Sequence, residues 1–321
     1  MTVYRSNIKS NTERRGMSEL SKTLLSILLI AVAFYLSLCL SGKISHSVST
    51  ALSLCANVII PSVFPFIILS DFLYAFLDFS SIKFIGDFFE RIFKINRCGI
   101  YPFALGMSCG FPLGVKCTTE MYKEGRLTRG EAERLIGFCN NTGPAFLVSG
   151  VGVGLRGRIE DGVILYFVML ISAVMVGTLF SIPEKRVVGK ENSFRENSFS
   201  LTRSIKNAGL GTLNICSYLT FFACTVGLLR NLIGENYVYL SIIPFLEIGS
   251  ATSILSKTKL LDANLSLIFS AFAVGFSGLS VHLQSLSYIS ETDLSVKKYF
   301  LMKLLQGIIS AALTAAYLLI K

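Results

Sequence analysis

The sequence predicts an all-α, polytopic membrane protein with two related, inverted halves that contain broken or re-entrant helices. Of its 321 residues, 52% are hydrophobic and only 16% are charged, whereas soluble domains average about 25% charged residues. The charged residues gather in short clusters, and the apolar runs between them reach the length of about 20 residues that a helix needs to cross a bilayer. Two similar glycine-containing segments indicate an internal repeat.

Five apolar runs are expected to form membrane-spanning helices. Only one of them contains a charged residue, Asp71. The runs are Thr23–Ser41, Ile59–Leu77, Val163–Pro183, Ala208–Leu229 and Leu304–Ile320. Their number and length predict a multi-pass protein of the cell membrane whose main partner is the lipid bilayer.

The formal net charge is +10, and the Lys and Arg residues flank the apolar runs. This placement is typical of loops retained on the cytoplasmic side, so we interpret the charge as a topology signal and not as a nucleic-acid surface. The chain is then expected to contain a basic cytoplasmic tail, a first membrane half, a basic cytoplasmic loop and a second membrane half. These parts comprise residues 1–22, 23–183, 184–207 and 208–321.

Two short helices are predicted at the edge of the membrane. Between Ser80 and Arg97, apolar residues recur every three or four positions among charged ones, which predicts an amphipathic helix lying in the interface. Thr128 is followed three residues later by Glu131, and this pair is the sequence of a capping box that starts a helix.

The apolar run Gly99–Val115 is interrupted by helix-breaking residues. Gly106, Gly110, Pro112 and Gly114 fall within nine residues, which is not compatible with a continuous helix of ordinary stability. Basic stretches flank the run, so it is expected to enter and leave the membrane on the cytoplasmic side as a re-entrant hairpin. Its open backbone would contact a solute, and the alternative is that the small residues serve close helix packing.

A second broken span is predicted at Ile136–Leu155, where Asn140, Asn141 and the following Gly143-Pro144 pair interrupt the apolar sequence. Two uses of the asparagines remain open. They either hydrogen-bond a polar solute or satisfy the broken backbone beside them.

The second half contains a short match to the first. Phe272–Ser277 is identical to Phe103–Ser108 at four of six positions, and each segment is followed by glycine within two residues. The match predicts a second hairpin around Gly275 and Gly278. Paired broken segments in two halves are the best sequence indication of a transporter binding site.

The orientation of this second half stays open at this point. An inverted repeat would place Lys297, Lys298 and Lys303 on the outer side. That placement conflicts with the positive-inside rule.

Three polar side chains stand out in the second half. Glu247 lies in an apolar run next to Pro244, where a carboxylate costs about 2.5–3.5 kcal/mol on insertion scales. It is expected to bind a cation, a proton or a solute, and the alternative is a structural hydrogen bond made by the protonated form. His282 and Gln284 are expected to line a polar path, with a structural role as the alternative for the histidine.

Catalysis and metal binding are not expected. No CxxC pair or other metal-ligand spacing occurs, and no HExxH, GxSxG or Walker A motif is present. We expect no catalytic residue, no metal and no cofactor apart from a coupling cation, H⁺ or Na⁺. The candidate substrate-binding residues are Gly106, Ser108, Gly110, Pro112, Gly114, Asn140, Asn141, Glu247, Gly275, Ser277, Gly278, His282 and Gln284.

Six short stretches carry a family resemblance: residues 61–66, 106–114, 127–132, 138–146, 245–249 and 278–284. In combination they resemble the YlbJ-type sporulation integral membrane proteins, over about residues 24–320. The resemblance implies nucleoside-recognition, or Gate, domains that are similar to the repeat units of concentrative nucleoside transporters. It also implies an endospore-forming bacterium and a role in making mature spores.

Two functions are compatible with these features. The first is a Gate-type transporter or permease-like protein for a small polar solute. The alternative is a structural or assembly component of the forespore membranes that does not transport. Partners other than lipid would be the solute, a second copy of the chain or other sporulation membrane proteins.

Overall fold

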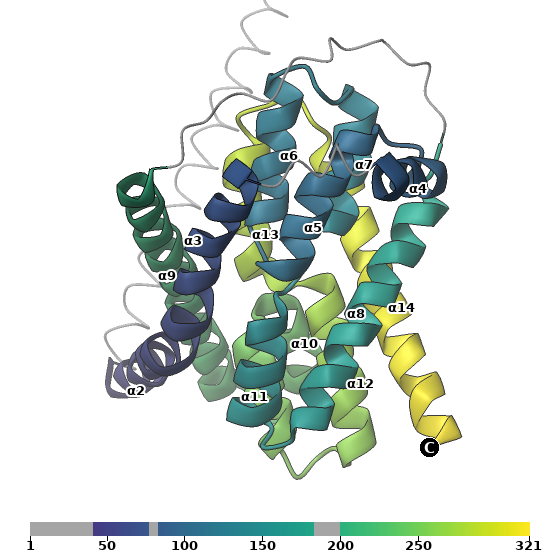
Figure 1. The fold of residues 1–321 in the computed structure, drawn as a ribbon. Coiled ribbons are helices and arrows are strands. Elements are labelled where there is room, and N and C mark those ends of the chain that lie inside the picture. The colour runs from purple at the N-terminus through teal and green to yellow at the C-terminus, as the bar shows by residue number, and fades with distance from the viewer. Residues whose placement is uncertain (1–40, 77–82, 183–199) are drawn as a thin grey trace, which may run out of the picture. The chain divides into compact units, whose positions relative to one another are not determined.

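The computed structural model describes residues 41–76, 83–182 and 200–321, and every regular element in these ranges is a helix (Figure 1). The prediction of an all-α protein is confirmed. The chain divides into two compact units after Ser47, and the second unit, Val48–Lys321, contains all of the helices from η1 onward. The predicted tail 1–22 and nearly all of the predicted span Thr23–Ser41 lie outside the described residues.

The described helices follow one another in this order: α2 (Ser41–Leu54), η1 (Cys55–Ile59), α3 (Ile60–Phe76), α4 (Lys83–Phe93), η2 (Arg97–Gly99), α5 (Ile100–Ser108), α6 (Leu113–Lys123), α7 (Arg129–Cys139), η3 (Ala145–Leu155), α8 (Ile159–Leu179), α9 (Leu201–Ile233), α10 (Tyr237–Leu246), α11 (Ile248–Lys257), α12 (Ala263–Phe276), α13 (Gly278–Ile289) and α14 (Val296–Ile320).

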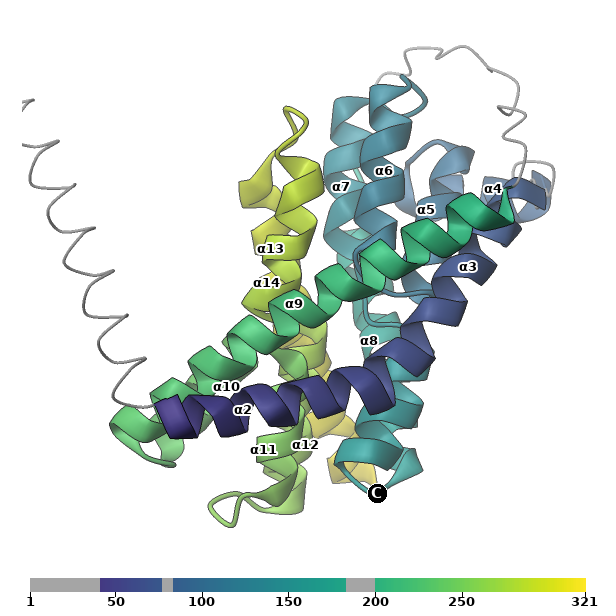
Figure 2. The same ribbon diagram turned by 90° about the vertical axis from the view of Figure 1, so that its left-hand side faces the viewer.

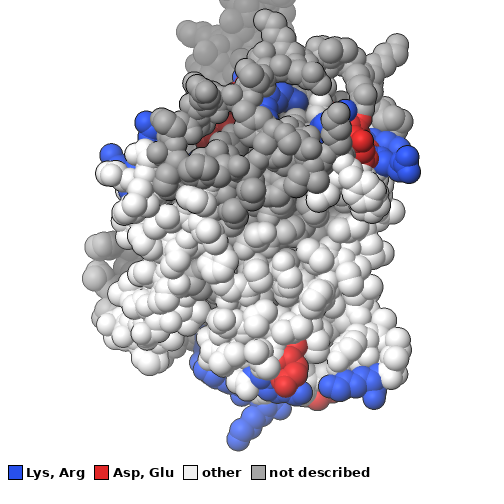
Figure 3. All heavy atoms as spheres, in the orientation of Figure 1, with Lys and Arg blue, Asp and Glu red and all other residues white. Residues whose placement is uncertain are grey.

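Four helices of the described residues are long and apolar enough to cross a membrane: α8, α9, α14 and the span Ala263–Ile289 formed by α12 and α13. A fifth is present if the bent pair Ser45–Ile59 and Val63–Leu69 counts as one span. On the face shown in Figure 3, charged atoms gather at two opposite edges, and the broad band between them carries almost none. The protein is therefore a multi-pass membrane protein, as predicted.

Helix α9 differs from its predicted start. Residues 201–207, which the sequence analysis assigned to the basic loop, form its first two turns, and the Ser200 side chain caps them. The 33 residues of α9 span roughly 50 Å at 1.5 Å per residue, more than a bilayer core of about 30 Å. A helix of that length is accommodated by tilting, and Figure 2 shows α9 running obliquely beside α3.

The two short helices at the membrane edge are confirmed. In α4, Phe84 is 84% exposed while Phe89 is 3% exposed, so one face packs on the core and the other is left for the interface. At the start of α7, Glu131 N donates to Thr128 Oγ1 at 3.2 Å, and Thr128 N donates to Glu131 Oε2 at 2.9 Å. This is the capping box that the sequence indicated.

The first half contains the expected hairpin. Helices α5 and α6 pack side by side, and the chain reverses at 109–112, where Gly110 has a φ of +88°. Helices α7 and η3 follow as the predicted broken segment, interrupted at 140–144, although they are not among the four helices or the bent pair that qualify as spans. Helix α8 follows and completes the half.

The second half also contains a hairpin, but at another place than predicted. Helices α10 and α11 pack against each other, and the chain reverses at Glu247. The segment around Gly275 and Gly278, predicted to be a hairpin, is instead a local break in the span Ala263–Ile289. Only Ser277 and Gly278 adopt positive φ there, and α13 continues in the same overall direction.

The order hairpin, broken span, unbroken span therefore occurs twice in the described residues. The matched sequences Phe103–Ser108 and Phe272–Ser277 do not occupy equivalent places in this order. The first ends a hairpin helix, α5, and the second ends the first part of a broken span, α12. The two sequences are alike because both helix ends pack closely against a neighbouring helix and therefore contain small residues.

Because the second hairpin is α10–α11, the lysines near the start of α14 no longer conflict with the positive-inside rule. The loop between α13 and α14 lies beside the loop between α6 and α7 (Figure 1). Lys298 Nζ lies 2.6 Å from Glu133 Oε2, and Tyr122 Oη donates to Asp293 Oδ1 at 2.7 Å. The hydrogen bond from Tyr122 lowers the pKa of Asp293. Lys298 thus shares one side of the membrane with the basic α6–α7 loop, in agreement with the positive-inside rule.

A first prediction concerns this topology. In a cysteine-free background, a membrane-impermeant maleimide should label Lys259→Cys in intact cells and Asp293→Cys only after permeabilisation, because the two loops lie at opposite ends of one span. Arg195→Cys, outside the described residues, is expected to behave like Asp293→Cys because its loop is basic. Labelling of both Lys259→Cys and Asp293→Cys from outside would contradict the span.

A second prediction concerns the tie between α7 and α14. The Glu133 side chain is only 5% exposed and accepts from Arg129, Lys298 and the Ser295 amide. Glu133→Ala should lower the free energy of unfolding by about 1–3 kcal/mol, because three donors lose their acceptor. The matched control is Glu291→Ala, whose exposed pair with Lys123 should contribute less than about 1 kcal/mol. Equal melting temperatures for the two variants in detergent would refute this account.

Candidate solute-binding site

The four chain breaks come together in two pairs. A Cβ added to Gly110 would lie 2.8 Å from the Gly143 nitrogen, so the first hairpin turn touches the first broken span. A Cβ added to Gly278 would lie 3.1 Å from the Leu246 carbonyl oxygen, so the second hairpin turn touches the second broken span. At both contacts glycine allows backbone to approach backbone.

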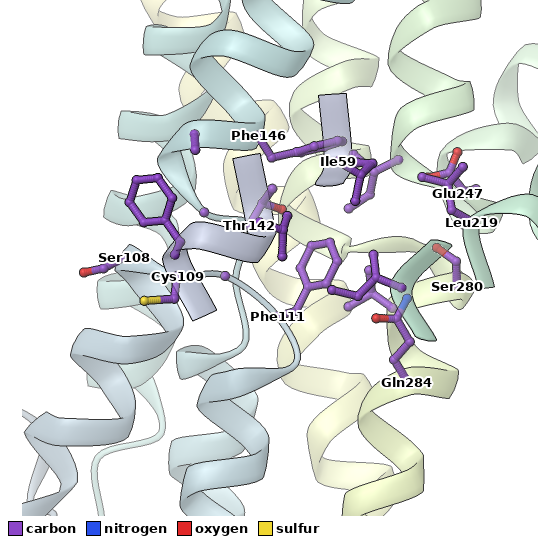
Figure 4. Close-up of a pocket in the computed structure, with 18 residues that line it drawn as sticks. Ile59, Ser108, Cys109, Phe111, Thr142, Phe146, Leu219, Glu247, Ser280 and Gln284 are labelled. Atoms are coloured by element: carbon purple, nitrogen blue, oxygen red, sulfur yellow. The ribbon is translucent and has the colours of Figure 1, made fainter. Parts of the chain in front are cut away.

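A cavity of about 40 Å³ lies where the two pairs meet. Its wall contains residues of three of the breaks and of α13, which begins directly after the fourth, together with apolar residues of η1, α3 and α9. Figure 4 shows Ser108 and Cys109 on one side, Glu247, Ser280 and Gln284 on the other, and Phe111 between them. The space is large enough for a few water molecules.

Two polar atoms of the cavity wall are unpaired. Thr142 Oγ1 and Gln284 Oε1 are buried and have no hydrogen-bond partner in the described part of the chain. The Ser280 side chain lines the same wall and is 3% exposed. Buried polar atoms normally find a partner, so this wall is suited to a polar solute or water.

Glu247 lines the cavity but acts mainly as a helix cap. Its Oε1 accepts from the Gly249 amide at 2.7 Å, and its Oε2 accepts from the Ser250 amide. Both oxygens are acceptors at the N-terminus of α11, where the helix dipole favours an anion. The geometry favours the structural alternative over cation binding for this carboxylate.

The glycines of the first hairpin divide into two groups. Gly110 lines the cavity, whereas a Cβ on Gly106 or Gly114 would overlap the Cys139 carbonyl oxygen. These two glycines therefore serve close packing of α5 and α6 on α7. Pro112 precedes α6 and does not reach the cavity.

In the second half, Gly275 also serves packing, because a Cβ there would overlap the Ser310 hydroxyl of α14. Ser277 and Gly278 form the break and stand behind the cavity wall. His282 is fully buried, and its Nδ1 lies 2.9 Å from Tyr299 Oη. Of the candidate residues, Ser108, Gly110, Glu247 and Gln284 line the cavity, and the other nine do not.

Asn140 and Asn141 satisfy groups inside the fold. Asn140 Nδ2 donates to Ser285 Oγ at 2.8 Å and to Tyr299 Oη at 2.9 Å. Asn141 Nδ2 donates to the Phe138 carbonyl at 2.6 Å. The Asn141 bond favours the structural alternative, in which an asparagine satisfies the broken backbone beside it. The Asn140 bonds fit neither alternative, because they join the break to hydroxyls of α13 and α14.

Two buried residues of α14 belong to the site although they are not among the candidate residues. Lys303 and Gln306 are both fully buried and hydrogen-bond the break at 140–141. A signal for them exists, because the polar residues of the last apolar run recur every three or four positions and share one helix face. This buried polar face consists of Tyr299, Lys303, Gln306, Ser310 and Thr314.

Among the described residues, no three His, Cys, Asp or Glu side chains come together in a way that would hold a metal ion. The seven described cysteines are free. The polar chemistry of the site therefore comes from hydroxyls, amides, one carboxylate and the open backbone of the breaks.

Comparison with known proteins identifies a relative among the sporulation proteins. No family model matches the chain, and no solved structure matches it. The sporulation integral membrane protein YlbJ of Bacillus subtilis (strain 168) is 28% identical over 309 aligned residues, which cover 82% of this chain and 74% of that protein. Over most of its length the chain is therefore similar to a YlbJ-type sporulation integral membrane protein.

Proposed function

We propose that the protein is a Gate-type transporter or permease-like protein that moves a small polar solute across a membrane during spore formation. The observation that carries the proposal is the meeting of three chain breaks and the start of α13 around one cavity with unpaired polar atoms. Irregular backbone at membrane depth is tolerated only where it is buried in protein or lines a cavity. Transporter binding sites are built from such breaks near the membrane midplane.

The order of elements supports the same proposal. Hairpin α5–α6 lies in the upper part of Figure 1 and hairpin α10–α11 in the lower part. Two hairpins that enter from opposite sides are what an inverted repeat requires, and we include that relation and the Gate domain in the proposal. The link to sporulation rests on the similarity to a sporulation integral membrane protein.

The size of the cavity indicates a closed state. About 40 Å³ holds only a few water molecules, so an organic solute would enter only after the walls separate. Contacts of Glu133 with Lys298 and of Tyr122 with Asp293 hold the cytoplasmic ends of the two halves together. We infer that these contacts belong to the closed form. We also propose that the protein is not an enzyme.

The alternative, a structural component of the forespore membranes, is favoured by a specific observation. Most candidate residues already serve the fold: Gly106 and Gly114 in packing, Asn140 in a buried network, and Glu247 as a cap. The unpaired polar atoms of the cavity separate the two functions, because the fold makes no use of them.

A third prediction distinguishes the transporter from the structural component. Thr142→Val and Gln284→Leu remove polar atoms that have no partner in the described residues, so the melting temperature should stay the same or rise. A transporter should nevertheless lose most heat-resistant spores in a spore-forming host that lacks its own YlbJ-type protein. The matched control is Thr178→Val on the exposed face of α8, which should sporulate normally. Normal spore yield for both cavity variants at normal protein level would favour the structural component.

A fourth prediction concerns Glu247→Gln. An amide offers one acceptor oxygen, so its NH₂ group would face one of the two backbone amides that the carboxylate now caps. The variant should lose about 1–2 kcal/mol of stability, as an impaired N-cap does. Thermal unfolding of the purified protein measures this loss. A Gln variant with unchanged stability but no spores would instead restore the ion-binding hypothesis for this residue.

A further inference from the structure

Lys303 is the most unusual charged side chain of the described residues. It lies in the membrane-spanning helix α14 and is fully buried. None of the ion pairs in the described ranges includes it. An ammonium without a carboxylate partner at such a place needs other compensation.

Three neutral oxygens provide that compensation. Lys303 Nζ donates to Gln306 Oε1 at 2.7 Å, to the Asn140 carbonyl oxygen at 2.8 Å and to Asn141 Oδ1 at 3.3 Å. An ammonium has three N–H donors, so each donor has one acceptor.

The surrounding network fixes which way the two amides point. Asn141 Nδ2 donates to the Phe138 carbonyl, so its Oδ1 faces Lys303 and also accepts from Gln306 Nε2 at 2.6 Å. The oxygens are therefore oriented toward the ammonium by bonds made on their other side. Such orientation is typical of a built site, in which the ligands are held by their own partners.

The break at the end of α7 adds to the field at this point. Helix α7 ends at Cys139, and Asn140 is its C-cap residue, so the Asn140 carbonyl belongs to the negative end of the helix dipole. Neutral carbonyl and amide oxygens at an unwound helix are also the ligands that transporters offer to a monovalent cation. The titratable side chains that interact electrostatically with Lys303 are Cys139 and His282, and neither is a carboxylate.

We propose that these three oxygens form a monovalent-cation site and that the Lys303 ammonium is its built-in occupant. The cation that holds the break is thus covalently attached and is not taken from solution. Thr142 and Gly143, which line the solute cavity, directly follow the residues that form the site. The proposal goes beyond the proposed function and does not depend on it, because it concerns how this wall is held in any function.

Thermal unfolding of the purified full-length protein in detergent tests the proposal with two substitutions. Lys303→Met replaces the ammonium by an apolar group of similar length and should lower the melting temperature by at least about 5 °C, because the oxygens lose their donors. The melting temperature of Lys303→Ala should fall as well, but the shorter side chain leaves room for a free cation. Propylammonium should then raise the melting temperature of the Ala variant and not that of the wild type or the Met variant.

Two controls distinguish a cation from a space filler. The neutral analogue 1-propanol should not stabilise Lys303→Ala, whereas Na⁺ or K⁺ should stabilise it in part. A Met variant that melts at the wild-type temperature would overturn the proposal, because no cation would then be needed. Equal rescue of the Ala variant by 1-propanol and propylammonium would also overturn it.

A second measurement does not depend on the yield of the Ala variant. Gln306→Leu removes one acceptor and should lower the melting temperature strongly when Lys303 is present. In the Lys303→Met background the same change should have a clearly smaller effect, because the two residues act as a unit. Equal effects in both backgrounds would show that Gln306 does not serve the ammonium and would overturn the proposal.

Discussion

The fold depends on one constraint. The described part of the chain is broken at four places inside an apolar molecule, at two hairpin turns and two interrupted helices, and the open backbone groups there must be satisfied without bulk water. The structure meets this constraint in three ways. Glu247 takes up amides at the start of α11, Lys303 takes up a carbonyl at the end of α7, and Gly110 lets one break lie directly on another. These three residues therefore position the backbone segments that line the cavity.

The signs of the two charges follow the helix dipole. The anion Glu247 lies at a helix N-terminus and the cation Lys303 at a helix C-terminus, which is the favourable placement in each case. In an apolar environment the dipole is poorly screened, so each charge is compensated without an opposite charge beside it. The two most conspicuous charges of the membrane region therefore serve the breaks, and the polar atoms left for a solute are hydroxyls and amides.

Much of this was predictable from the sequence, because apolar length and helix-breaking residues act locally. The spans, the first hairpin, the interfacial helix α4 and the capping box at Thr128 all follow from such local rules. The second hairpin was misplaced because a six-residue likeness reports the small residues of a helix end and not its place in the fold. Lys303 was missed because it was grouped with Lys297 and Lys298 at the flank. One and a half turns further along the helix, the same residue type is fully buried.

The polar bonds across the cavity differ in strength, and this indicates which wall moves. The segment that carries Thr142 is held to α14 by two bonds from the Lys303 ammonium, which are stronger than bonds between neutral groups. Gln284 lies on α13. Among the described residues, one neutral hydrogen bond, from Asn140 to Ser285, joins the same segment to α13. A second neutral contact, from His282 to Tyr299, joins α13 to α14. Each neutral bond is worth about 1 kcal/mol net, so separating α13 from the break costs less than separating the break from α14. The cavity is therefore expected to widen on the α13 side, with α7 and α14 remaining together.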